Sequence, residues 1–104
     1  MKEILINPEE RKWEDLAGYP RGTKLSVLRR DENGRIRTML MKLGSNFSMG
    51  GHTNIIGEEQ LILEGEIQSN GETYGKGSYR FIPERSSHDS WTSEKGALVL
   101  VRWD

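Results

Sequence analysis

The stretch that decides the fold is residues 58–65, which read EEQLILEG. Its middle, residues 60–63, predicts a short apolar strand that ends at the glycine. Successive side chains of a strand point to opposite sides. Glu58, Gln60 and Ile62 therefore share one face, which we expect to be the interior face.

Other strand-like runs and turn signals surround this stretch. The expected strands are residues 2–6 at an edge, 23–30, 35–43, 66–68, 78–82 and 97–103. The turn signals are Asn33-Gly34, Asn70-Gly71 and Gly75-Lys76-Gly77, of which the Asn-Gly pairs are the strongest short-range indication of a hairpin. Residues 13–16 suit either one helical turn or an extended arm, and we expect the arm.

The composition agrees with an all-β protein. Twelve glycines and three prolines accompany seven or eight short strands, and no long helical pattern is present. This spacing is typical of an antiparallel sandwich or barrel. We expect one domain over residues 1–104, with an arm at 1–22 and a barrel at 23–104. The apolar run 97–103 suggests burial on both faces or at a dimer interface.

Charge and composition exclude several classes of protein. The net charge of −1 argues against nucleic-acid binding and against adhesion to an anionic membrane. The absence of cysteine excludes disulfides, thiol catalysis and iron–sulfur clusters. Residues 1–10 lack the apolar core of a signal peptide, and no run is long enough to span a membrane, so we expect a cytoplasmic protein.

The sequence has only two histidines, His52 and His88. Either one alone is more often an ordinary surface or core histidine than a ligand. Their spacing to other residues changes this interpretation, because Glu58 follows His52 by six positions and precedes His88 by thirty.

At these positions the sequence resembles the cupin superfamily. Its two motifs are G-x5-H-x-H-x3–4-E-x6-G and G-x5-P-x-G-x2-H-x3-N. The matching residues are His52, Glu58, Gly65, Gly77, Pro83 and His88. The departures are Asn46 and Arg85 in place of glycines, Asn54 in place of the second histidine, and Thr92 in place of the final asparagine. The resemblance implies an antiparallel double-stranded β-helix, a jelly-roll-like barrel of the RmlC type.

Residues 57–65, 77–83 and 87–88 resemble more closely the cupin domain of ChrR-type anti-sigma factors and its stand-alone relatives. That resemblance implies a bound divalent metal and frequent homodimers, and some relatives are similar to dioxygenases. The residues before the barrel have no helical pattern, so they do not predict a helical domain that could bind a sigma factor. We therefore expect no direct anti-sigma role.

Two imidazoles and one carboxylate make a facial ligand set that leaves open positions on a metal. We expect His52, Glu58 and His88 to hold one divalent ion, which could be zinc, iron, manganese or nickel. Asn54 is either a weak fourth ligand or a group that orients a metal-bound water or substrate. A decayed, metal-free barrel is the alternative.

Further residues are candidates for the pocket wall. These are Gln60, Ile62, Tyr79, Phe81 and Trp91, although each is also suited to core packing. Arg80 and Arg37 suit an anionic substrate, but strand arginines usually lie on a solvated face. No catalytic residue is evident.

Three functions stay open at this point. The first is a small metal-dependent enzyme acting on a small molecule, with dioxygenase-like chemistry. The second is a regulatory module, with or without metal, that senses a small molecule. The third is a metal-free scaffold that works through its dimer surface. Fold alone does not choose among them.

Overall fold

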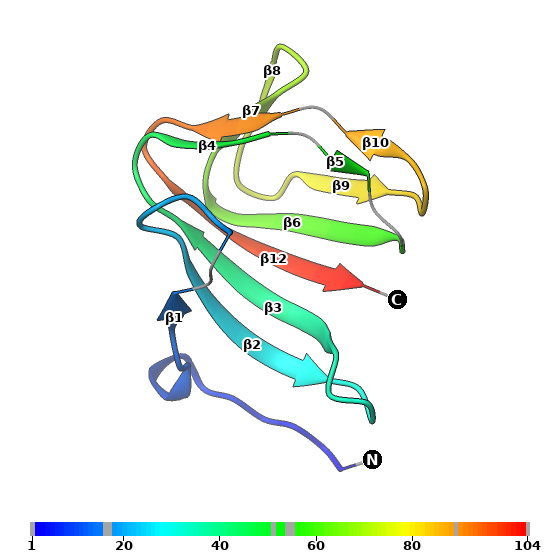
Figure 1. Cartoon of the computed structure of the whole chain (residues 1–104). Helices are drawn as coiled ribbons and strands as arrows, with labels where there is room; N and C mark the ends of the chain where they lie inside the picture. The colour runs from blue at the N-terminus through cyan, green and yellow to red at the C-terminus, as the bar shows by residue number, and fades with distance from the viewer. Residues whose placement is uncertain (1, 16–17, 51, 54–55, 89, 104) are drawn as a thin grey trace.

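The computed structural model describes residues 2–15, 18–50, 52–53, 56–88 and 90–103, and of residues 52, 53, 87 and 88 it describes the backbone. The fold is built from two antiparallel sheets and one additional strand pair (Figure 1). The six-stranded sheet has the order β1 (Glu14–Asp15), β2 (Lys24–Arg30), β3 (Ile36–Leu43), β12 (Ala97–Trp103), β6 (Glu58–Gly65) and β9 (Tyr79–Ile82). The four-stranded sheet has the order β4 (Phe47–Met49), β11 (Trp91–Ser93), β7 (Ile67–Ser69) and β8 (Glu72–Tyr74). The separate pair is β5 (His52–Thr53) with β10 (Ser87–His88), and the one short helix of the described part is the 3₁₀ helix Pro8–Glu10.

The prediction of an all-β antiparallel fold is confirmed. The described part forms twelve strands rather than seven or eight, because several are only two or three residues long. Segments that short carry too few residues for their alternation to be recognised in a sequence.

The hydrophobic core lies between the two sheets. One cluster joins Met41 and Val99 of the six-stranded sheet to Phe47, Ile67 and Trp91 of the four-stranded sheet. All five are almost completely buried. A single core of this kind fixes which face of each strand points inward.

Strand β12 lies between β3 and β6 and alternates despite its continuous apolar sequence. Val99 and Val101 are buried, whereas Leu98 and Leu100 are partly exposed on the outer face. The continuous apolar sequence of β12 therefore does not mark burial on both faces within the chain. The outer face instead keeps an apolar strip.

The N-terminal segment differs from the expectation. Residues 2–6 form no strand, and Ile4 and Ile6 border a hollow on the outer face of the six-stranded sheet together with Leu28 and Leu100. Pairing along the outer side of β2 involves Glu14–Asp15 instead, which confirms an extended conformation for those residues. Ile4 and Leu5 stay largely exposed, at 51% and 79% of their surface.

The two Asn-Gly turns are confirmed as hairpins but differ in conformation. Asn70 and Gly71 both have positive φ, 55° and 75°, as a two-residue type I′ turn requires. In the first hairpin only Gly34 has positive φ, and the loop is held by Asp31, whose carboxylate accepts hydrogen bonds from the backbone N–H groups of Asn33 and Arg35.

Two of the departures from the cupin motifs have a positive φ, the backbone region that glycine adopts most easily. Asn46 has φ of 59° and Arg85 has φ of 60°. Side chains with a Cβ adopt this region at a cost of about 1–2 kcal/mol, and asparagine tolerates it better than arginine.

Candidate functional site

The two histidines lie opposite each other in the strand pair β5–β10. His52 is the register partner of His88, and Thr53 is the partner of Ser87. The side chains of both histidines lie outside the described residues, and so does the whole of Asn54. The structure thus places two of the predicted ligands by backbone position alone.

Glu58 begins β6 and is buried, with 7% of its surface exposed. The indole Nε1 of Trp103 donates a hydrogen bond of 3.0 Å to Glu58 Oε1. The side-chain amide of Gln60 donates to Glu58 Oε2. Both groups are donors, so they suit a carboxylate in its ionised form, which only accepts.

The guanidinium of Arg80 extends this set of hydrogen-bonded side chains, so that Glu58, Gln60 and Arg80 form a polar chain. Arg80 of β9 is the register partner of Gln60, and its Nε and Nη2 donate to Gln60 Oε1 at 3.1 and 2.8 Å. Its Nη1 donates to Ser69 Oγ at 3.3 Å, and its guanidinium carbon lies 5.9 Å from the ring centre of Trp91. The hydrogen bonds thus run in one direction, from Arg80 to Gln60 and from Gln60 to Glu58.

Burial shifts the pKa of Arg80 and the pKa of Tyr19, and the charge of Glu58 acts on both groups. Burial lowers the pKa of Arg80, while the negative charge of Glu58 acts in the opposite direction. Burial raises the pKa of Tyr19, and the charge of Glu58 raises it further. At neutral pH the Tyr19 phenol therefore stays protonated.

The orientation expected for β9 needs correction. Phe81 is 52% exposed and Tyr79 is 58% exposed, and the Tyr79 hydroxyl donates to Glu59 Oε1 at 2.8 Å. Phe81 is therefore not an interior pocket residue, and Tyr79 only borders a small cavity beside Gln60 and Arg80. The register of β9 against β6 decides this, because it places Arg80 opposite Gln60 on the inner face.

The remaining pocket candidates are buried. Gln60, Ile62 and Trp91 each expose 3% of their surface. Trp91 packs edge-to-face against Phe47, with 5.0 Å between the ring centres, and its Nε1 has no hydrogen-bond partner within the described ranges. The sequence left Arg80 open between binding an anionic substrate and lying on a solvated face, and its pairing with Gln60 places it on the inner face.

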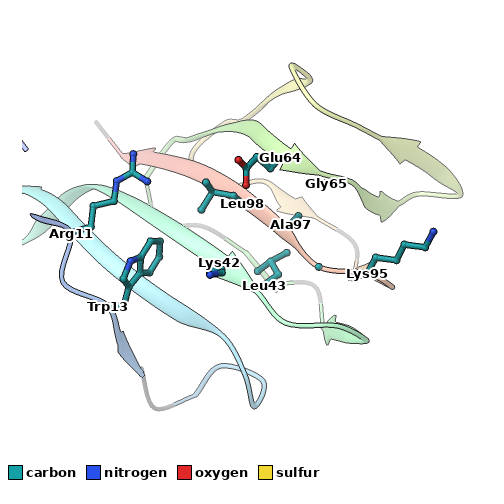
Figure 2. Close-up of a pocket in the computed structure, with 10 residues that line it drawn as sticks. Arg11, Trp13, Lys42, Leu43, Glu64, Gly65, Lys95, Ala97 and Leu98 are labelled. Atoms are coloured by element: carbon teal, nitrogen blue, oxygen red, sulfur yellow. The ribbon is translucent and has the colours of Figure 1, made fainter. Parts of the chain in front are cut away.

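A hollow of about 390 Å³ lies on the outer face of the six-stranded sheet, opposite to the face that carries Gln60 and Arg80 (Figure 2). Trp13 and Leu98 lie along it, and the ammonium of Lys42 lies 5.8 Å from the Trp13 ring centre. Figure 2 shows that Arg11 and Lys95 lie at opposite ends of this hollow. Their charges therefore do not converge on one ligand.

Among the residues whose side chains are described, no three of His, Asp and Glu come together as a metal-binding group. The histidine side chains are not part of that set. The metal ligand set consequently stays a prediction. In the described part of the chain, no helix has the length and apolar character needed to cross a membrane.

The architecture is that of a cupin, a small antiparallel barrel with its polar chain on the inner face of β6 and β9. Residues 1–103 match the family model of the ChrR cupin-like domain, and the chain belongs to that family. No curated protein matches the chain in sequence.

Solved structures of the same fold come from proteins of different activities. The complex of Rhodobacter sphaeroides SigE with the anti-sigma factor ChrR matches with a TM-score of 0.73 and 20% identity, covering 94% of this chain and 52% of that one. The polyketide cyclase RemF of Streptomyces resistomycificus matches at 0.78 and 23%, covering 99% and 78%. An acetylacetone dioxygenase from Acinetobacter johnsonii matches at 0.77 and 14%, covering 99% and 73%. The chain thus spans about half the length of its ChrR neighbour, and at these identities the likeness concerns the fold.

Proposed function

We propose that this chain binds one divalent metal ion through His52, Glu58 and His88 and uses it to act on, or to sense, a small molecule. The observation that carries the proposal is the pairing of His52 with His88 in register across β5–β10. Residues directly opposite in an antiparallel pair are close enough to share one partner. Family membership supports a ligand-binding role for the barrel.

The chemistry of Glu58 fits such an ion. Its oxygens are buried and accept hydrogen bonds from Trp103 and Gln60. A carboxylate can accept from about four directions, so these bonds are compatible with metal coordination. They also hold the carboxylate in one orientation, which strengthens a ligand.

A bound divalent ion would supply a Lewis acid with open coordination positions, and zinc, iron, manganese and nickel all accept this ligand set. The chain's own residues would orient the ligands and exclude water from the site. Glu58 would be oriented by Trp103, and the buried side chains of Ile62 and Trp91 would keep water away. Asn54 would be either a weak fourth ligand or a group that orients a bound water or substrate.

Two roles remain for such a site. Acetylacetone dioxygenase and polyketide cyclase neighbours favour an enzyme, and we propose dioxygenase-like chemistry as its form. Membership in the ChrR cupin-like family favours a regulatory module that senses a small molecule. Oxygen uptake in the presence of a 1,3-diketone distinguishes them, because a sensor binds without consuming oxygen.

Metal content tests the proposal directly. We expect freshly purified protein to contain about one equivalent of a divalent metal by elemental mass spectrometry, because the site has one ligand set. Removing the metal with a chelator should lower the melting temperature, and adding it back should restore it. A double variant, His52→Ala with His88→Ala, should hold none. Protein that carries no metal and takes up none on addition would contradict the proposal.

We further propose a cytoplasmic homodimer in which a second copy covers the outer face of the six-stranded sheet. A hollow of about 440 Å³ on that face is bordered by Leu28, Leu63 and Leu100, which are apolar and available for contact. We expect light scattering to give twice the 11.9 kDa mass of the chain. Leu100→Glu should return the mass to that of a monomer, while the matched change at the exposed Thr92, Thr92→Glu, should not. A monomeric mass for the unmodified protein would contradict the dimer.

A further inference from the structure

Arg80 is a half-buried cation that no acidic side chain neutralises by direct contact within the described part of the chain. The ion pairs found there involve Lys24, Arg37 and Arg102 instead. Among the described residues, Arg80 donates to the neutral oxygens of Gln60 and Ser69 alone. A guanidinium removed from water in this way normally has a carboxylate or another anion as its partner.

The region around Arg80 has more hydrogen-bond donors than acceptors. Its guanidinium has five N–H groups, and the described contacts use one on each of its three nitrogens. The adjoining indole of Trp91 adds a buried Nε1 that lacks a partner among the described residues. A ligand rich in acceptors would satisfy this excess.

The net charge of the site leads to the same conclusion. A divalent ion with two neutral imidazoles and one carboxylate keeps one net positive charge, and Arg80 adds another. Gln60 stands between Arg80 and Glu58 and takes a hydrogen bond from one while giving one to the other. Arg80 is therefore held beside the proposed metal ligand without forming an ion pair with it through the described contacts.

Resting on the proposed metal-binding function, we propose that Arg80 recognises the carboxylate of a small organic acid inside the barrel. The guanidinium offers a planar fork that matches a carboxylate in two parallel hydrogen bonds. The guanidinium is oriented before a ligand binds, because its Nε and Nη2 donate to Gln60 and its central carbon lies over the Trp91 ring. The substrate or signal of this protein is thus an anion.

Binding of simple acids and their neutral counterparts tests this assignment without knowledge of the natural ligand. Acetate and benzoate are compared with acetamide and benzamide by titration calorimetry and by tryptophan fluorescence, on protein with measured metal content. We expect the acids to bind at least about 10-fold more tightly than the amides, since a hydrogen bond to a charged group is the stronger kind. Equal binding of acid and amide by the unmodified protein would overturn the proposal, and this comparison needs no variant.

Variants then locate the recognition. Arg80→Gln should abolish the preference for the acid, and Arg80→Lys, which keeps the charge but loses the fork, should retain only part of it. Arg102→Gln is the matched control, because it removes the same charge from the outer face of the same sheet. A preference for acids that survives in Arg80→Gln would overturn the role of Arg80.

The metal measurement separates the two proposals. If metal is present in Arg80→Gln at the level of the unmodified protein and the preference for acids is lost, both proposals stand. If the unmodified protein binds acids through Arg80 but never takes up metal, the metal site fails and the anion site stands. If metal is bound but acids and amides bind alike, the anion site alone fails.

Discussion

Gly65→Ala is expected to lower the free energy of unfolding by about 3–5 kcal/mol, the largest effect on stability that we expect from a single added methyl group. Gly65 ends β6 with φ of 75°, a region in which a side chain costs about 1–2 kcal/mol. A Cβ there would also overlap the carbonyl oxygen of Gly96 and lie 2.9 Å from the Cα of Ala97. Backbone atoms of the neighbouring strand would have to move, because no flexible side chain can give way.

The matched control for this variant is Gly71→Ala. Gly71 also has φ of 75°, but a Cβ there would meet no atom within 4 Å. We expect a loss of only about 1–2 kcal/mol, which is the conformational cost alone. Urea unfolding monitored by tryptophan fluorescence measures both. Equal losses in the two variants would mean that the close approach of β6 to the Gly96–Ala97 segment does not limit the packing.

Glu58→Gln is expected to weaken metal binding by at least about 100-fold, the largest effect that we expect on the proposed function. The variant removes the one negative charge from the proposed ligand set. It also places an amide NH₂ in the polar chain. Because Trp103 and Gln60 both donate to Glu58, the new donor would face at least one of theirs. Gln60 would then have to turn its amide, which brings a donor toward Arg80.

Glu59→Gln controls for the loss of charge. Glu59 is the next residue, but it lies on the outer face, where Arg102 Nη1 donates to it at 2.6 Å and Tyr79 at 2.8 Å. We expect this variant to keep a full equivalent of metal by elemental mass spectrometry. A Glu58→Gln protein with undiminished metal affinity would remove Glu58 from the ligand set, whatever the fate of the histidines.

Much of the fold followed from local chemistry. The Asn-Gly pairs marked two hairpins because few other residues adopt the required turn, and Asn70 and Gly71 both have positive φ. The alternation around Gln60 indicated its inner face correctly, because strand side chains alternate without exception over such a short run. The segment 2–6 has the composition of a strand but forms none, and its Ile4 and Leu5 are largely exposed.

Only part of the candidate site could be predicted from the sequence. The residue types and spacing of His52, Glu58 and His88 are properties of the chain, and so is their resemblance to the cupin motifs. The pairing of His52 with His88 joins segments that are far apart in the chain, so it depends on the register of β5 and β10.

The sequence of this protein determined its class, its turns and the identity of its proposed ligands, because each depends on a few neighbouring residues. Tertiary structure alone decided that Arg80 faces inward and that Tyr79 and Phe81 face outward. A shift of one residue in the pairing of β9 with β6 would exchange these faces, and nothing within β9 itself prevents that shift. The register is set by packing against the whole core, in which Ile82 is buried opposite Glu58.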